Sequence, residues 1–193
     1  MPVVVDSDQR RAAVVAAAAD LVIEGGLPAV TFRNLAARLG CSTTVISHYF
    51  KDKNEVLRET YRHVIAESVA MREKLLADMK PSFVRLLEEV LPVADMQRRH
   101  WTIWLCFWTA ALFEPGLLEE HRLGLAGTRE RARAQFLAAG IGAEQAEIQA
   151  QDVCDALFGI AMQALFDRQY WTPERQRAAF RRAVAHLPAI SLG

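Results

Sequence analysis

Short polar side chains crowd a stretch of the sequence that begins at Thr43. In a helix, side chains four positions apart lie on one face, which places Thr43 beside Ser47 and Thr44 beside His48. Hydroxyl and imidazole groups can hydrogen-bond to base edges or phosphate oxygens, and a Val45 methyl can contact a thymine methyl. The pattern predicts a helix that reads a DNA groove, although the solvated face of a small helical hairpin has a similar composition.

Two short helices joined by a tight turn would position these side chains. Thr31 is a suitable N-cap for a helix over residues 32–39, and Gly40 can take the left-handed conformation that ends it. Ser42 or the residue after it then caps the second helix. Because such a turn makes the helices cross steeply, the small side chain of Ala36 is expected where they touch.

Charge does not by itself indicate a nucleic-acid-binding protein. The 193 residues include 23 Lys and Arg and 23 Asp and Glu, and residues 1–53 have a surplus of only one basic residue. The 52% apolar and 24% charged residues are typical of a water-soluble chain, and the longest apolar run, residues 12–19, is too short to span a membrane. No membrane partner is therefore expected, and the three widely separated cysteines indicate a reducing cytoplasm as the location.

Helical spacing of apolar residues recurs almost from end to end, which predicts an all-α fold. Glycine and proline mark the borders of about nine helices. The expected helices cover residues 8–24, 32–39, 43–49, 52–79, 82–91, 95–113, 116–139, 143–170 and 173–187.

Two domains are predicted from the change in helix length. Residues 1–52 are expected to form a three-helix DNA-binding domain whose helix-turn-helix motif covers residues 31–50. Residues 53–193 are expected to form an effector-binding and dimerisation domain.

Aromatic residues in the second domain are candidates for a ligand pocket. Trp101, Trp104 and Trp108 share one helical face, and indole rings attract cations such as quaternary ammonium groups. A tryptophan-rich core stripe explains the same spacing. The predicted ligand-binding residues are Trp101, Trp104, Phe107, Trp108, Phe158 and Met162.

The N-terminal motif resembles the DNA-binding domain of TetR-family regulators over about residues 8–58. The matching residues are Thr31, Ala36, Gly40, Cys41, Ser42, Tyr49, Phe50 and Lys53. The resemblance implies that Thr31 and Arg33 contact phosphates or a neighbouring groove edge and that Tyr49 and Lys53 hold the DNA backbone. It also implies base contacts by Thr43, Thr44, Val45 and His48. Position 44 is often Gly or Ala in that family, so the operator preference of relatives does not transfer to this chain.

Shorter stretches resemble the BetI-like branch of that family, the choline-responsive repressors of betaine synthesis. The similar stretches are residues 46–50, 52–54, 107–109 and 155–159. This resemblance implies a cationic or amine effector such as choline. A hydrophobic drug or metabolite remains the alternative effector.

The last two expected helices have apolar stripes and predict a homodimer. The stripes include Val153, Leu157, Ile160 and Ala164, and then Phe180, Val184 and Leu187. The resemblance implies that these helices pair with those of a second subunit and that the dimer binds a palindromic operator.

Other function classes have less support in the sequence. The five histidines are dispersed, and no nucleophile motif or phosphate-binding glycine loop accompanies them, so neither an enzyme nor a catalytic residue is expected. The three cysteines lie far apart in apolar surroundings, so no metal site or cofactor is expected. A helical adaptor that binds only protein is the other alternative, and the polar face that begins at Thr43 argues against it.

Overall fold

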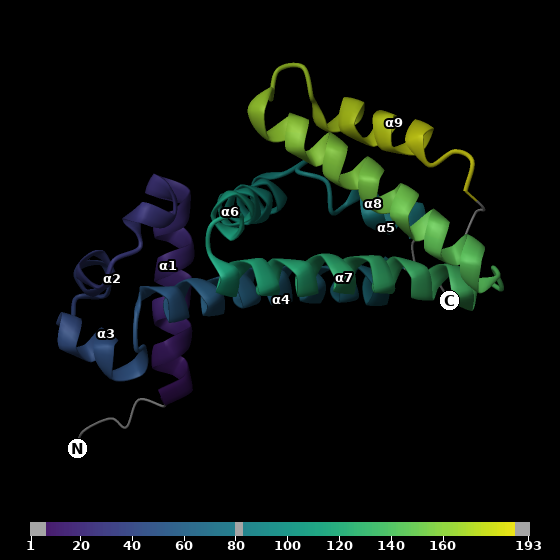
Figure 1. Cartoon of the computed structure of the whole chain (residues 1–193). Helices are drawn as coiled ribbons and strands as arrows, with labels where there is room; N and C mark the ends of the chain where they lie inside the picture. Colours follow the sequence, from purple (N-terminus) through teal and green to yellow (C-terminus); the bar gives the residue numbers. More distant parts are fainter. Residues whose placement is uncertain (1–6, 80–82, 188–193) are drawn as a thin grey trace. The chain divides into compact units, whose positions relative to one another are not determined.

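A computed structural model describes residues 7–79 and 83–187, apart from the side chains of residues 75–79 and 84. Within these ranges the chain forms helices and no strand, which confirms the predicted all-α class (Figure 1). The helices are α1 (Ser7–Ala29), α2 (Phe32–Leu39), α3 (Thr43–Tyr49), α4 (Lys53–Met79), α5 (Phe83–Glu88), α6 (Asp95–Ala111), α7 (Pro115–Ala138), α8 (Ala143–Phe166) and α9 (Pro173–Ala183).

Packing divides the chain into two compact units. The first contains residues up to 66 together with 103–120, and the second contains residues 67–102 and those from 121 onward. The helices α4, α6 and α7 therefore have residues in both units. The units do not coincide with the predicted border at residue 52, because the first part of α4 packs with α1–α3.

The first unit has a continuous apolar core under α1, α2 and α3. Leu35 of α2 and Ile46 of α3 are fully buried, and Phe50 is 1% exposed. Tyr61 of α4 and Phe107 of α6 complete the core, with ring centroids 5.1 Å apart. This core fixes α2 and α3 against α1 and leaves their opposite faces outward.

The helix α1 contains the predicted glycine break, although its assigned bounds extend to Ala29. Gly25 (φ −151°, ψ 19°) and Gly26 (φ 68°, ψ −172°) both leave the helical region. The positive φ of Gly26 is a conformation that favours glycine. The break predicted at these glycines is therefore confirmed.

Among the described helices, α1 alone is long and apolar enough to span a membrane. A core helix passes the same test, and Val14, Ala18 and Val22 of α1 are each 3% exposed or less. The apolar character of α1 is therefore accounted for by the core of the first unit.

In the second unit α9 packs on α8 and α5, and α8 and α9 lie side by side (Figure 1). The apolar stripe of α8 is buried inside the chain, with Val153 1% and Leu157 2% exposed. Phe180 of α9 is fully buried as well. The stripes noted in the sequence thus hold α8 and α9 within one chain, and a second subunit would have to use another face.

A buried carboxylate also ties α9 to α5. The Glu88 side chain is 2% exposed and accepts two hydrogen bonds from the Arg181 guanidinium, one of 2.7 Å at Nη2. Arg85 lies 3.8 Å from the same carboxylate. These pairs compensate the cost of burying the Glu88 charge.

Most helix ends lie within two residues of the predicted borders, and the larger differences are at C-terminal ends. Thr172 caps α9 by accepting a hydrogen bond from the Arg175 N–H (3.3 Å). The helix α8 ends at Phe166 and not at Tyr170, because Asp167 leaves the helical region and accepts the Tyr170 N–H (2.9 Å). The helices α5, α6 and α9 also end two to four residues before the predicted borders.

Candidate DNA-binding interface

The turn between α2 and α3 has the predicted geometry. The Thr31 hydroxyl oxygen accepts a hydrogen bond from the Asn34 N–H (3.1 Å), which caps α2. Gly40 is left-handed (φ 62°, ψ 35°), and the Cys41 N–H donates to the Ala36 carbonyl (3.0 Å). A glycine at this position lets the chain reverse into α3 within a few residues.

The helix α3 turns one apolar side chain inward and its polar face outward. Ile46 is fully buried beside Leu35, whereas the five predicted DNA-contacting residues that precede Tyr49 on this helix are exposed. They are Thr43, Thr44, Val45, Ser47 and His48. The exposed side chains are short, so a groove surface could approach the α3 backbone closely.

The predicted phosphate contacts flank this face. Arg33 is exposed, and Thr31, Tyr49 and Lys53 are partly buried. Because the Thr31 oxygen already accepts the α2 cap hydrogen bond, its O–H remains able to donate to a phosphate. The Tyr49 ring meets the His48 ring edge to face, with centroids 5.0 Å apart, and so limits the positions that His48 can adopt.

A reciprocal cap starts α4 directly after α3. Asp52 Oδ1 accepts the Glu55 N–H (2.8 Å), and Glu55 Oε2 accepts the Lys51 N–H (2.7 Å). The Lys51 amide, and then the Arg11 guanidinium, lower the pKa of Glu55 below its ordinary value. Asp52 and Glu55 thus fix the connection between α3 and α4.

Arg11 of α1 is a positioning residue that the sequence did not reveal. Its guanidinium donates to the Tyr49 carbonyl and to Glu55 Oε1 (3.0 Å), and lies 4.4 Å from the centre of the Phe50 ring. These contacts hold the end of α3 and the start of α4 on α1. The partners are 38 and 44 residues away along the chain, so no local pattern could indicate them.

Comparison with known proteins identifies both parts of the chain. Residues 14–60 match the family described as "Bacterial regulatory proteins, tetR family", and residues 80–189 match "BetI-type transcriptional repressor, C-terminal". The "HTH-type transcriptional regulator BetI" of Burkholderia mallei (strain NCTC 10229) is 32% identical over 150 residues, which are 69% of this chain and 76% of that protein. The chain belongs to the TetR family, with a BetI-type C-terminal region.

Solved structures of transcriptional regulators have the same fold. A transcriptional regulator from Rhodococcus sp. Rha1 superposes with a TM-score of 0.80 at 24% identity, over 92% of this chain and 95% of that one. A transcriptional regulator from Saccharomonospora viridis, solved in complex with choline, also has a TM-score of 0.80, at 18% identity over 94% and 98% of the two chains.

Membership in this TetR family settles the function class. The protein is a DNA-binding transcriptional regulator that resembles BetI-type repressors, and the family is not one of enzymes. The match over residues 14–60 contains most of α1, all of α2 and α3 and the start of α4, which belong to the first unit described above.

The aromatic residues predicted to bind a ligand are placed in both units of this TetR-family chain. In the second unit Trp101 is 6% exposed, donates its indole N–H to the Val90 carbonyl (2.7 Å) and packs edge to face on Phe158. Met162 of α8 is partly buried. These contacts give Trp101 a structural role, and its ligand role stays a prediction.

The other predicted aromatics belong to the first unit. Phe107 is 1% exposed in its core, and the partly buried Trp104 and Trp108 rings lie 5.4 Å apart. Their part in ligand binding likewise stays a prediction.

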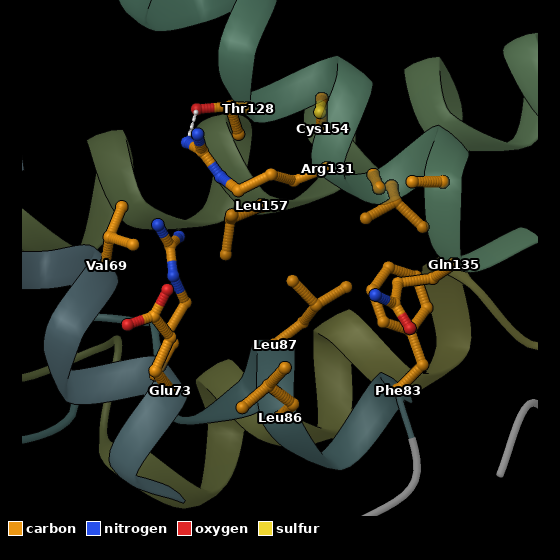
Figure 2. Close-up of a pocket in the computed structure, with 14 residues that line it drawn as sticks. Val69, Glu73, Phe83, Leu86, Leu87, Thr128, Arg131, Gln135, Cys154 and Leu157 are labelled. Atoms are coloured by element: carbon orange, nitrogen blue, oxygen red, sulfur yellow. Dashed lines mark hydrogen bonds between the residues drawn. The ribbon is translucent and has the colours of Figure 1, made fainter. Parts of the chain in front are cut away.

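A cavity of about 260 Å³ lies within the second unit, lined by residues of α4, α5, α7 and α8 (Figure 2). None of the predicted aromatic residues lines it. Its walls include Phe83, Leu86, Leu87, Val153 and Leu157, together with the charged side chains of Arg72, Glu73 and Arg131. Cys154 also lines the cavity, and burial raises the pKa of its thiol to about 11, which favours a structural over a reactive role.

Proposed function

We propose that this TetR-family regulator is a homodimeric repressor that binds a palindromic operator through α3 and leaves it when a small-molecule effector binds. The observation that carries the proposal is the arrangement of α3, with Ile46 fully buried and the polar face outward. That arrangement supports base contacts by Thr43, Thr44, Val45, Ser47 and His48. Thr31, Arg33, Tyr49 and Lys53 are the proposed contacts to the DNA backbone or to a neighbouring groove edge.

An exposed face of α8 supports pairing with a second copy. Ile148 (49% exposed), Gly159 and Phe166 (76% exposed) follow one another at intervals of 11 and 7 residues, so they lie on one helical face. A side-chain carbon at Gly159 would meet nothing within 4 Å, so another helix has room to approach there. Two copies joined in this way would place two α3 helices on half-sites about 34–36 Å apart or more.

The effector would act by a shift between two dimer populations. A ligand that binds the DNA-free arrangement more tightly lowers the operator affinity by the same coupling free energy. BetI-type relatives and the choline complex of the Saccharomonospora viridis regulator support an amine such as choline. A hydrophobic drug or metabolite is the second candidate. The cytoplasm, where the DNA lies, is the proposed location.

Titration of promoter fragments tests the DNA-binding part of the proposal. We expect one promoter near the gene to bind preferentially, with an affinity that falls steeply as salt concentration rises. Tyr49→Ala should weaken binding to every fragment, whereas Tyr170→Ala, which removes an exposed tyrosine outside the interface, should not. Equal binding by the two variants would contradict the assigned interface.

Tryptophan fluorescence tests the amine effector. Choline, polyamines and hydrophobic cations are titrated into the folded dimer, and quenching is expected for at least one of them because indole faces attract cations. The same compound should then release the bound promoter. A dimer that responds to none of these cations would exclude the amine class.

A further inference from the structure

The cavity of the second unit has a charged end and a mainly apolar end, where Gln135 is the polar residue. Figure 2 shows Val69, Glu73 and Arg131 at one end of the space and Phe83 and Gln135 at the other. Leu87 and Leu157 lie between them. A ligand that matches both ends must itself have one charged group and an apolar body.

Arg72 contributes a positive charge that is poorly compensated. Among the side chains that the structure describes, no carboxylate forms an ion pair with its guanidinium, and the side chain is partly buried. Burial, and then the nearby charge of Arg131, lower the pKa of Arg72 to about 10, while Glu73 opposes the shift. The guanidinium is thus protonated at neutral pH but has lost part of its hydration.

Arg131 adds a second cation to the same end. Its Nη2 donates to the Thr128 hydroxyl (3.2 Å), which leaves other guanidinium N–H groups available to a ligand. Glu73 is the one acidic residue among those that line the cavity, and both Glu73 and Arg131 are exposed. Two cations against one carboxylate leave this end with a positive surplus.

The rest of the lining is mainly apolar, with the polar side chains of Thr128 and Gln135 among it. Phe83, Leu86, Leu87, Val153 and Leu157 are each 8% exposed or less. The volume of about 260 Å³ lies just under the range of roughly 300–1,000 Å³ typical of small-molecule sites. The space therefore suits a small ligand with a short hydrocarbon body.

We propose that this cavity binds a small amphipathic carboxylate, whose acid group pairs with Arg72 and Arg131 and whose hydrocarbon body packs between Phe83 and Leu157. Arginine is suited to this role because its N–H groups match the two oxygens of a carboxylate. A cationic amine would add positive charge beside two guanidinium groups, so this cavity does not suit the amine effector proposed above. Binding is independent of DNA, whereas a role for this ligand as the effector rests on the proposed function.

Three probes with the same hydrocarbon tail test the class of ligand. Octanoate, octanol and octylammonium are titrated calorimetrically into the full-length protein without DNA. Octanoate is expected to bind at least about tenfold more tightly than the other two, because only it gains charged hydrogen bonds. Octylammonium binding as tightly as octanoate, or no binding of octanoate, would overturn the proposal.

Charge variants test the assigned residues. Arg72→Gln and Arg131→Gln should each weaken octanoate binding about tenfold, whereas Glu73→Gln should strengthen it because the repelling carboxylate is removed. Arg122→Gln makes the same change of net charge at an exposed α7 residue that does not line the cavity, and should leave the affinity within about twofold. Equal affinities for Arg72→Gln and Arg122→Gln would contradict the site, and circular dichroism checks that each variant is folded.

Operator release separates this inference from the proposed function. If octanoate binds but leaves the bound promoter in place, the anion site stands and its regulatory role is refuted. If promoters are not bound at all, the calorimetric result still decides the anion site.

Discussion

Arg11 lies in α1, yet its contacts hold the C-terminal end of α3 in place. Its guanidinium contacts the Tyr49 carbonyl, the Phe50 ring and the Glu55 carboxylate, so three successive parts of the chain share one support. The DNA contacts proposed for Tyr49 and Lys53 depend on where this junction lies. A residue that touches no DNA therefore influences DNA affinity by positioning.

Replacing Arg11 tests that role. Arg11→Ala is expected to lower the unfolding free energy by about 1 kcal/mol, since partly buried hydrogen bonds to Tyr49 and Glu55 are lost. Arg11→Ala should also weaken operator binding by more than Arg10→Ala does, because Arg10→Ala removes one positive charge without disturbing the end of α3. Arg10→Ala, at the exposed neighbouring position, is the matched control. Urea unfolding and DNA titration provide the measurements, and equal behaviour of the two variants would refute the positioning role.

Prediction from sequence at the residue scale succeeded where a role depended on local pattern. The outward face of α3 follows from helical periodicity, so the exposure of Thr44 and His48 could be inferred. Arg11 and Arg72 act through residues distant in the chain, and no local pattern distinguishes them from other arginines. The tryptophans were predicted to bind a ligand because of their residue type, yet Trp101 has structural partners in Val90 and Phe158.

At the element scale, the α2–α3 turn depends on Gly40. Its φ of 62° is unfavourable for residues with a side-chain carbon, although open space surrounds the position. Gly40→Ala should therefore destabilise the protein by roughly 1–2 kcal/mol through backbone strain alone. Gly40→Asn should recover part of that loss, because asparagine tolerates the left-handed region. Thermal unfolding measures both, and an unchanged Gly40→Ala midpoint would contradict the strain.

The attachment of α9 to α5 depends on the Glu88–Arg181 pair. Arg181→Ala leaves the buried Glu88 carboxylate with Arg85 at 3.8 Å as its remaining ion-pair partner among the described side chains, so the unfolding free energy should fall by about 1 kcal/mol. Arg182→Ala alters an exposed neighbour on the same helix and serves as control. Urea unfolding compares the two, and a loss for Arg182→Ala as large as that for Arg181→Ala would exclude a specific contribution from the pair.

The helix borders show which sequence signals are sufficient to predict where a helix begins or ends. Caps that combine a hydroxyl residue with a following helical pattern, at Thr31 and Thr172, were predictable because the cap hydrogen bond is local. The end of α8 was not predictable, because the apolar spacing continues beyond Phe166. The Asp167 carboxylate accepts the Tyr170 N–H there in place of a helical carbonyl. The predicted dimer stripes were misjudged in a similar way, since Leu157 and Phe180 are buried within one chain.

At the scale of the whole molecule, the proposed dimer requires a surface that one chain leaves uncovered. Phe166→Glu should convert the dimer into a monomer, because it places a charge on the exposed α8 face. Leu123→Glu makes the same kind of change at an α7 residue that is 63% exposed, and should leave the dimer intact. Analytical ultracentrifugation distinguishes the two, and a dimer that survives Phe166→Glu would place the subunit contact elsewhere.

Selection from a random-sequence DNA library tests the central claim most directly, namely that α3 reads bases as part of a symmetric dimer. Wild-type protein and Thr44→Ala are each used to enrich bound DNA, and the retained sequences are compared. The wild-type pool should contain an inverted repeat, and the Thr44→Ala pool should contain the same repeat with altered preference at one position in each half-site. A wild-type pool without a common sequence, or identical preferences in the two pools, would contradict the claim.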